Sequence, residues 1–410
     1  MKDSGIDWIG KIPDEWEINK IDSLYTLRNT KVSDKNYPPL SVTMKGIVPQ
    51  LATAAKSDDG DNRKLVKKGD FVINSRSDRR GSSGISNYEG SVSLINTILT
   101  PRGRMNPDYY NWLFHTVQFE DEFYKWGHGI VDDLWTTRWQ DMKNISVLVP
   151  PEEAQEKIAN FLDKKCAQID SIIEESKKSI EEYKSWKQSV IFEAVTGKNL
   201  SCKKKDSGID WIGKIPEEWI VSKAKTILHN KTVKNHPNAE VLSLYRDLGV
   251  VPKNSRDDNH NVTSEDTSSY KFVQKGELVL NKMKTWQGSL AVSNYEGIVS
   301  PAYYVCEFTN NEIDKNYIHY LLRNKMYAQE FERLSTGLRV GQWDLSIDDF
   351  LNTLIIYPPT KSEQTKIAKF LDAKCAQIDS LISEKQSLIK DLAEYKKSLI
   401  FEAVTGKRRV

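Results

Sequence analysis

The sequence predicts an α/β protein made of two tandem units and two long antiparallel helices, and three observations lead to this prediction. The string KDSGIDWIGKIP, followed by EW, occurs within residues 2–20 and again within 205–223, with 15 of 19 positions identical. Two further strings, FLDxKCAQID and IFEAVTGK, occur once in each half at a separation of 209 residues. The stretches between these strings share little. A period of about 200 residues indicates tandem domains and excludes a solenoid of short units.

The repeated strings divide the chain into six segments. These are an N-terminal repeated segment (1–20), a first variable domain (21–149), a first helix segment (150–198), a linker with the second copy of the repeated segment (199–223), a second variable domain (224–357) and a second helix segment (358–410). The variable domains share short strings only, such as GDFVIN and GELVLN, and SNYEG in both. We expect one common fold with different loops.

Each helix segment follows a Pro-Pro pair and places apolar or small residues at alternating steps of four and three, which is a heptad pattern. The first seam is Leu162, Cys166, Ile169, Ile173, Ser176, Ile180, Tyr183, Lys187 and Val190. The second seam is Leu371, Cys375, Ile378, Ile382, Lys385, Ile389, Leu392, Lys396 and Leu399. Helix over residues 153–195 would be roughly 60 Å long, long enough to act as a spacer.

An amphipathic helix usually packs on its own domain. Two matching seams in one chain favour pairing with each other instead, antiparallel if a pseudo-two-fold axis relates the units. The imperfect seam positions, which include Lys187 and Lys396, would weaken promiscuous pairing and help to fix the register. Gly197 and Gly406 follow the two helices and suit left-handed C-terminal caps.

Both variable domains mix short β-rich runs with helical stretches, which predicts α/β domains. The expected strands are LSVTM from Leu40, DFVIN from Asp70, ELVLN from Glu277 and TLIIYP from Thr353. The expected helical stretches cover residues 108–126 and 316–334.

Loop-like sequence in both variable domains combines basic and amide side chains with aromatic ones. Arg and Lys bind guanine edges and phosphates, and Asn and Gln bind adenine edges. Our candidate DNA contacts are Arg76, Arg79, Arg80, Arg138, Lys282, Lys284, Trp286, Gln287 and Arg339. Each charged residue alone is also compatible with an ordinary solvated surface, and Trp286 with a hydrophobic anchor of its loop. With 59 basic and 57 acidic residues, only local patches can support DNA binding.

Motifs of catalysis are missing from the sequence. It has no phosphate-binding GxxxxGK[ST] loop, no GxSxG turn and no glycine-rich cofactor loop. The Glu-x-Lys triplets at 182–184 and 394–396 lie in the heptad segments, where alternating charge is expected on a solvated face. The four cysteines and six histidines show no metal-ligand spacing. We expect a non-catalytic protein without cofactor or metal, and a cytoplasmic location since no signal or membrane-spanning run is present.

The repeated strings resemble those of one known family. DSGIDWIGKIP with EW, the PP-EEAQEKIANFLD and PP-TKSEQTKIAKFLD strings, CAQID and IFEAVTGK are similar to the specificity (S) subunit of bacterial type I restriction-modification systems, over the full length. NKMKTWQGSLAVSNYEGIVSPAY resembles one class of that family's target-recognition domains. The first domain has RSDRRGSSGISNYEG in its place and lacks the KTWQG string, so contacts carry over less directly to residues 76–80.

The resemblance implies two target-recognition domains that each read one half of a split, asymmetric sequence in double-stranded DNA. It further implies two methyltransferase (M) subunits and restriction (R) subunits as partners, with S-adenosylmethionine, ATP and Mg²⁺ bound only on those partners. The S subunit itself would carry no catalysis. Two alternatives remain at this point: a coiled-coil adaptor that binds only proteins, and a solitary specificity subunit without active partners.

Overall fold

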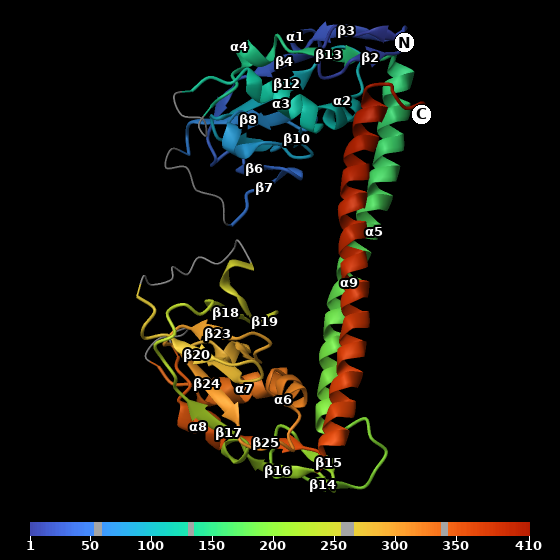
Figure 1. The fold of residues 1–410 in the computed structure, drawn as a ribbon. Helices are drawn as coiled ribbons and strands as arrows, with labels where there is room; N and C mark the ends of the chain where they lie inside the picture. Colours follow the sequence, from blue (N-terminus) through green and yellow to red (C-terminus); the bar gives the residue numbers. More distant parts are fainter. Residues whose placement is uncertain (53–59, 130–134, 256–265, 338–342) are drawn as a thin grey trace. The chain divides into compact units, whose positions relative to one another are not determined.

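The computed structural model describes residues 1–52, 60–129, 135–255, 266–337 and 343–410. The chain forms two compact units, and each unit contains one half of each long helix. Unit 1 comprises residues 1–177 and 386–410, and unit 2 comprises residues 178–385. The predicted fold class is confirmed: both units are α/β, and two long helices run antiparallel (Figure 1).

A four-stranded antiparallel sheet forms the centre of each variable domain. In unit 1 the strand order is β10 (Ser83–Ile85), β9 (Phe71–Asn74), β12 (Asn96–Pro101) and β4 (Tyr25–Arg28). In unit 2 it is β22 (Leu290–Val292), β21 (Leu278–Asn281), β24 (Tyr303–Phe308) and β17 (Leu228–Lys231). The same order in both units confirms that the variable domains share one fold although their sequences have diverged.

Smaller sheets and hairpins surround each central sheet. In unit 1 they are β1 (Lys2–Asp3) with β2 (Lys11–Ile12), β3 (Glu17–Lys20) with β13 (Ser146–Val149), β6 (Leu40–Thr43) with β7 (Gly46–Pro49), and β5 (Lys31–Val32), β8 (Arg63–Val66) and β11 (Gly90–Val92). In unit 2 they are β14 (Lys204–Asp206) with β15 (Lys214–Pro216), β16 (Ile220–Lys223) with β25 (Leu354–Tyr357), β18 (Leu242–Tyr245) with β19 (Gly249–Pro252), and β20 (Lys271–Val273) with β23 (Gly297–Val299). The strands expected from Leu40, Asp70, Glu277 and Thr353 are thus all present.

Each expected helical stretch divides into two helices. In unit 1 the pair is α2 (Pro107–Phe114) and α3 (Val117–Lys125), and in unit 2 it is α6 (Lys315–Leu322) and α7 (Lys325–Leu334). The break occurs because Thr116 and Asn324 accept hydrogen bonds from backbone N–H groups of the following helix and so cap it. Short helices complete the domains: α1 (Ile21–Leu24), α4 (Trp139–Met142) and α8 (Ile347–Asn352).

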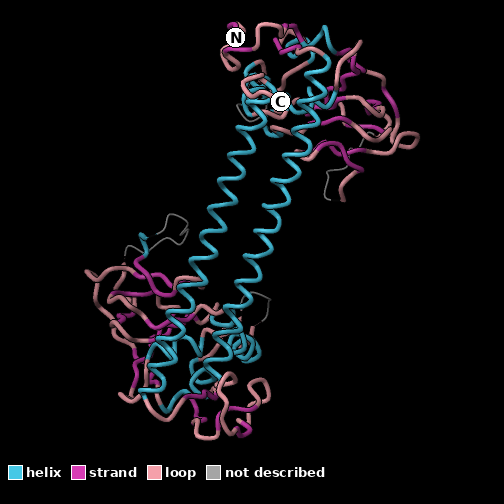
Figure 2. Tube along the Cα trace, turned by 90° about the vertical axis from the view of Figure 1, so that its right-hand side faces the viewer, coloured by secondary structure: helices cyan, strands magenta, loops and turns pink. Residues whose placement is uncertain are grey.

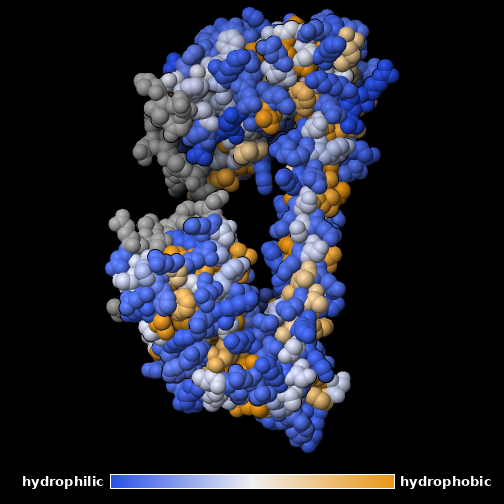
Figure 3. All heavy atoms as spheres, in the orientation of Figure 1, coloured by the Kyte–Doolittle hydropathy of each residue, from blue (hydrophilic) through white to orange (hydrophobic). Residues whose placement is uncertain are grey.

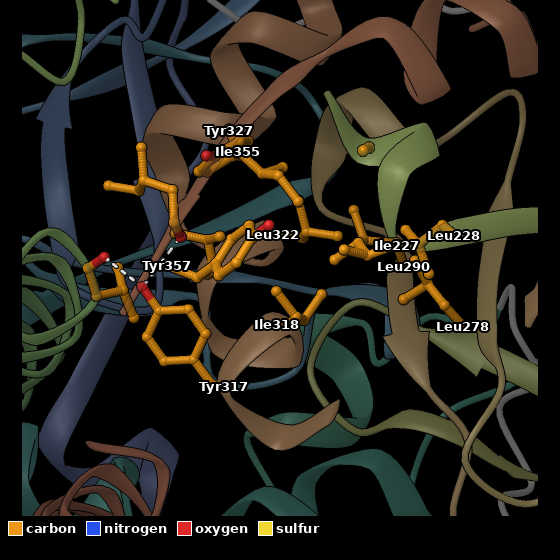
Figure 4. Close-up of a cluster of buried hydrophobic side chains, with 14 of the residues drawn as sticks. Ile227, Leu228, Leu278, Leu290, Tyr317, Ile318, Leu322, Tyr327, Ile355 and Tyr357 are labelled. Atoms are coloured by element: carbon orange, nitrogen blue, oxygen red, sulfur yellow. Dashed lines mark hydrogen bonds between the residues drawn. The ribbon is translucent and has the colours of Figure 1, made fainter. Parts of the chain in front are cut away.

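The helices of each variable domain cover one face of its central sheet and form the core there. In unit 2, Leu278 and Leu290 from the sheet pack in one cluster with Ile318 and Leu322 from α6 (Figure 4). The hydroxyl of Tyr317 crosses this core and donates to the carbonyl oxygens of Val195 and Ile356 at 3.0 and 3.1 Å. The variable domain is therefore tied to the long helix of its own unit.

The long helices are α5 (Glu152–Thr196) and α9 (Lys361–Val404), close to the lengths that the heptad pattern predicts. Figure 2 shows them side by side. All the predicted seam positions are buried or half-buried. Within unit 1, Leu162 and Cys166 share a core with Leu399 and Ala403. Within unit 2, the end of α5 packs in the same way against Leu371 and its neighbours.

Two ion pairs between the helices form in this register. In unit 1 the seam residue Lys396 lies 2.7 Å from Asp170, and in unit 2 the seam residue Lys187 lies 2.7 Å from Asp379. Both aspartates belong to the repeated string CAQID, so each helix gives one aspartate and one lysine to the other. Other registers would leave half-buried lysines unpaired, as expected from the polar seam positions.

The repeated strings meet one another at the helix ends. Gly197 and Gly406 end the helices with φ of 64° and 68°, which confirms the predicted left-handed caps. A Cβ on Gly406 would lie 2.5 Å from Pro13, and a Cβ on Gly197 would lie 2.5 Å from Pro216. The KIP string of each repeat therefore covers the VTGK string of the other, and this mutual fit explains why both remain nearly identical.

Candidate DNA interface

Three of the four candidate contacts of unit 1 lie on the connection that follows the central strand β9. It forms the short helix η1 (Ser77–Arg79) before the chain enters β10. Backbone hydrogen bonds join residues 75–77 to residues 135–137, directly before Arg138. The structure thereby brings Arg138 to the segment of Arg76, Arg79 and Arg80, although about sixty residues separate them in the sequence.

Carboxylates accompany the three arginines of η1 and its flanks. The Arg76 guanidinium lies 2.9 Å from Asp78, Arg79 lies 3.7 Å from the same carboxylate, and Arg80 pairs with Asp121. The three side chains remain between 38% and 67% exposed. Ion pairs at such exposed sites contribute little to stability. Their effect here is to orient the guanidinium groups and to lower the net positive charge of this loop.

The candidates of unit 2 lie on the equivalent connection after β21, which forms η5 (Thr285–Gln287). Lys282 lies 3.1 Å from Asp344, whereas Lys284 is exposed and precedes η5. The indole N–H of Trp286 donates to a backbone carbonyl at 2.9 Å, and its ring lies 5.5 Å from that of Trp343. Because Trp286 also packs against the core of unit 2, it anchors this loop. Arg339 lies outside the described residues.

Sequence reasoning missed two arginines that meet this loop. Arg246, in the hairpin between β18 and β19, donates to the side-chain oxygen of Gln287 at 2.8 Å. Arg323, directly after α6, donates to the Leu290 carbonyl at 2.7 Å and to the Asp247 carbonyl at 3.3 Å. Burial lowers the pKa of Arg323. The string YRDLG places a basic residue at a hairpin turn, and from it Arg246 could have been predicted as a DNA contact. The sequence around Arg323 contains no comparable indication.

A half-buried histidine, His319, lies beside Arg323. Burial, together with the nearby guanidinium, lowers the pKa of His319 to about 3. The ring is therefore neutral at neutral pH, and its Nδ1 accepts a hydrogen bond from the Val292 N–H at 3.2 Å. The histidine acts as a structural link between α6 and β22.

The described part of the chain contains no cluster of three or more His, Cys, Asp or Glu side chains suited to a metal ion. Among the same residues, no helix is sufficiently long and apolar to span a membrane. Cys166 and Cys375 of the repeated string are buried, and burial raises the pKa of the Cys166 thiol to about 11. A thiol with such a pKa is a packing group and a poor nucleophile.

The family comparison matches the two repeated units separately. Residues 13–182 and 216–391 each match the family described as type I restriction modification DNA specificity domain. The chain belongs to this family of specificity subunits. The two matches together cover most of the chain.

Individual relatives agree with this assignment. The chain is 24% identical to the type I restriction enzyme MjaVIII specificity subunit of Methanocaldococcus jannaschii, over 98% of this chain and 94% of that protein. It is 23% identical to the EcoKI specificity subunit of Escherichia coli K12, over 48% of this chain and 44% of that protein.

Solved structures share the fold. A chain from a study of complex assembly and conformational transition in the type I R-M system superposes with a TM-score of 0.73 at 12% identity, covering 97% of this chain and all of the other. The HsdS subunit from Thermoanaerobacter tengcongensis gives a TM-score of 0.58 at 14% identity, with 97% and 98% covered.

Proposed function

We propose that this specificity subunit reads an asymmetric DNA target in two halves, one per variable domain, and docks two M subunits and the R subunits without chemistry of its own. One observation carries the proposal: the two units match in their scaffold and differ in their loops. Loops with different side chains bind different base sequences, whereas identical scaffolds bind identical partners.

The long helices carry an exposed apolar pair in each unit, suited to a common partner. Ile172 and Tyr395 are 44% and 49% exposed in unit 1, and Leu381 and Trp186 are 37% and 46% exposed in unit 2. Ile172 follows Asp170 by two residues and Tyr395 precedes Lys396 by one, so the ion pair places them near the same level of the helix pair. The same holds for Leu381 and Trp186 beside Asp379 and Lys187.

These four side chains occupy equivalent positions in the two repeats, one aliphatic and one aromatic in each unit. Hydrophobic patches between charged residues are visible along the helices in Figure 3. Contiguous exposed apolar surface is typical of protein interaction sites, and we propose that each pair forms the centre of one. Two equal sites fit two copies of one partner, for which we propose the M subunit. Adenine methylation, with S-adenosylmethionine, ATP and Mg²⁺, would belong to the M and R subunits.

The experiment is adenine methylation mapped by single-molecule sequencing in cells that express the M subunit with and without this chain. We expect one split, asymmetric motif that depends on the chain. A methylation pattern that is the same in both cultures would contradict the proposal. Binding of M without any DNA motif would instead favour a protein-only adaptor.

A further inference from the structure

Arg246 and Gln287 form a polar pair at the edge of the candidate interface of unit 2. The Arg246 Nη2 group donates to the Gln287 Oε1 atom at 2.8 Å, and both residues are accessible to solvent. A guanidinium has only donors, so the amide oxygen, and not its NH₂ group, must face it. The oxygen of Gln287 is therefore engaged. The Gln287 NH₂ group and the remaining N–H groups of Arg246 are left as donors.

Arg323 holds the hairpin that carries Arg246. Its guanidinium donates to the Leu290 carbonyl of β22 and to the carbonyls of Arg246 and Asp247. One half-buried cation thus ties two carbonyl groups of the hairpin turn to the central sheet. Hydrogen bonds from a charged donor are worth about twice a neutral one, so the turn is well fixed.

The described residues of unit 1 do not contain an equivalent of this arginine and its hairpin contacts. The residue equivalent to Arg323 is His115, whose Nε2 lies 3.2 Å from the Ser83 hydroxyl and whose Nδ1 lies 2.7 Å from the Asn111 carbonyl. The hairpin of unit 1 has two residues between its strands, Met44 and Lys45, where unit 2 has three. The Arg246–Gln287 pair is thus a property of one half of the molecule.

The chemistry of the pair selects one kind of base edge. In the major groove guanine presents two acceptors, O6 and N7, whereas adenine presents one acceptor and the N6 donor. A glutamine that reads adenine must accept from N6 through its amide oxygen. In this chain Arg246 already donates to that oxygen and uses one of its two lone pairs, so the pair presents mainly donors and favours guanine.

We propose that Arg246 and Gln287 together read a guanine in the half-site bound by unit 2, with Arg323 as the positioning residue of the hairpin. The inference rests on the proposed function, because it assigns one base within the split target. It also predicts an asymmetry: the other half-site is independent of these residues.

The test uses the full chain with its M subunit and compares methylation motifs of the wild type with R246A, Q287L and R323K. K284A serves as a control, since an exposed lysine that contacts phosphate would weaken methylation at all sites alike. We expect R246A and Q287L to relax the same guanine position in the same half-site by about 5- to 150-fold, corresponding to the 1–3 kcal/mol of a bidentate contact. R323K should relax that position more weakly and accelerate hydrogen exchange in residues 242–252.

The possible outcomes distinguish a failure of the proposed function from a failure of the guanine contact. A wild type without any motif contradicts the proposed function, and the inference falls with it. A wild-type motif that R246A and Q287L leave unchanged, or relax in both half-sites, overturns the inference alone. If R246A abolishes methylation, binding of the complex to duplexes with single guanine-to-adenine changes decides: equal loss on all duplexes overturns the inference, and loss of discrimination at one position supports it.

Discussion

The two units agree where the repeated strings meet, and they differ in the connections that leave their central strands. At the helix ends, Tyr109 donates to the Val404 carbonyl at 2.7 Å, and Tyr317 donates to the Val195 carbonyl at 3.0 Å. In the connection after β9 of unit 1, three arginines have carboxylate partners. In the connection after β21 of unit 2, Gln287 instead accepts from Arg246 of the hairpin between β18 and β19. Strings that must fit each other stay alike, whereas loops that fit only an external ligand are free to diverge.

An ion pair inside the variable domains shows an intermediate case. Arg28 lies 2.7 Å from Asp70 in unit 1, and Lys231 lies 2.6 Å from Glu277 at the equivalent place in unit 2. The hydrogen bond to the carboxylate raises the pKa of both cations. In unit 1 the longer cation, arginine, pairs with the shorter acid, aspartate. In unit 2 the shorter cation, lysine, pairs with the longer acid, glutamate. The contact therefore persists although both residues differ. The fold therefore requires an ion pair at this place but does not require particular residues.

The largest effect is expected from the length of the helix pair. Removal of residues 173–179 and 382–388 takes one heptad from each helix and keeps both Lys–Asp pairs in register. At 1.5 Å per residue each helix shortens by about 10 Å, so the spacer of the methylation motif should shorten by about three base pairs, or methylation should be lost. Removal from α5 alone breaks the register and should abolish methylation. An unchanged spacer after the double removal would contradict the role of the helices as spacer.

The next largest effect is expected at the glycine caps that end the long helices, where the two units agree. A methyl group on Gly197 meets Pro216 and also requires a left-handed backbone, so G197A should destabilise the protein by at least about 1–2 kcal/mol. G208A is the matched control, since Gly208 has φ of 71° with open space around it. Thermal unfolding should show a larger loss for G197A than for G208A, and G406A should behave like G197A. Equal losses for G197A and G208A would show that the contact with Pro216 is unimportant.

A smaller expected difference between the units is the dependence of their stability on acid pH. His319 has a folded-state pKa of about 3 against 6.5 for the free side chain, so below pH 6.5 the unfolded chain gains a proton that the folded chain does not. The stability of unit 2 should therefore fall as the pH decreases from 6.5, by about 2 kcal/mol at pH 5.

Unit 1 has Asn111 at the equivalent position, which supplies the control variant H319N. Hydrogen exchange followed separately in the two units should show acid sensitivity of unit 2 in the wild type, reduced in H319N. The same pH profile in both proteins would rule out His319 as the cause.

The smallest effect is expected for the ion pairs between the helices, which are half-exposed. K187D should lower the stability by about 1 kcal/mol or less, and D379K in the same chain should restore most of it. A double-mutant cycle by chemical unfolding measures this coupling. A coupling energy near zero would mean that the apolar seam alone determines the register.

The sequence predicted the scaffold well because its determinants are local or repeated. The heptad pattern located both long helices within a few residues, and the two cap glycines followed from their positions after the last turn. The pairing of the loops could not be predicted in the same way. Asp121 and Asp344, which face Arg80 and Lys282, lie more than forty residues away from them in the chain. The burial of Arg323 likewise depends on its contacts with a hairpin that begins far upstream.

The exchange of one variable domain shows whether each domain reads its own half of the DNA target. Residues 21–149 are replaced by the equivalent domain of another specificity subunit, and adenine methylation is mapped in cells that express the M subunit. The account predicts a new sequence in one half of the motif, with the other half and the spacer unchanged. A change in both halves, or in neither, would contradict the division of the molecule into constant ends and independent readers.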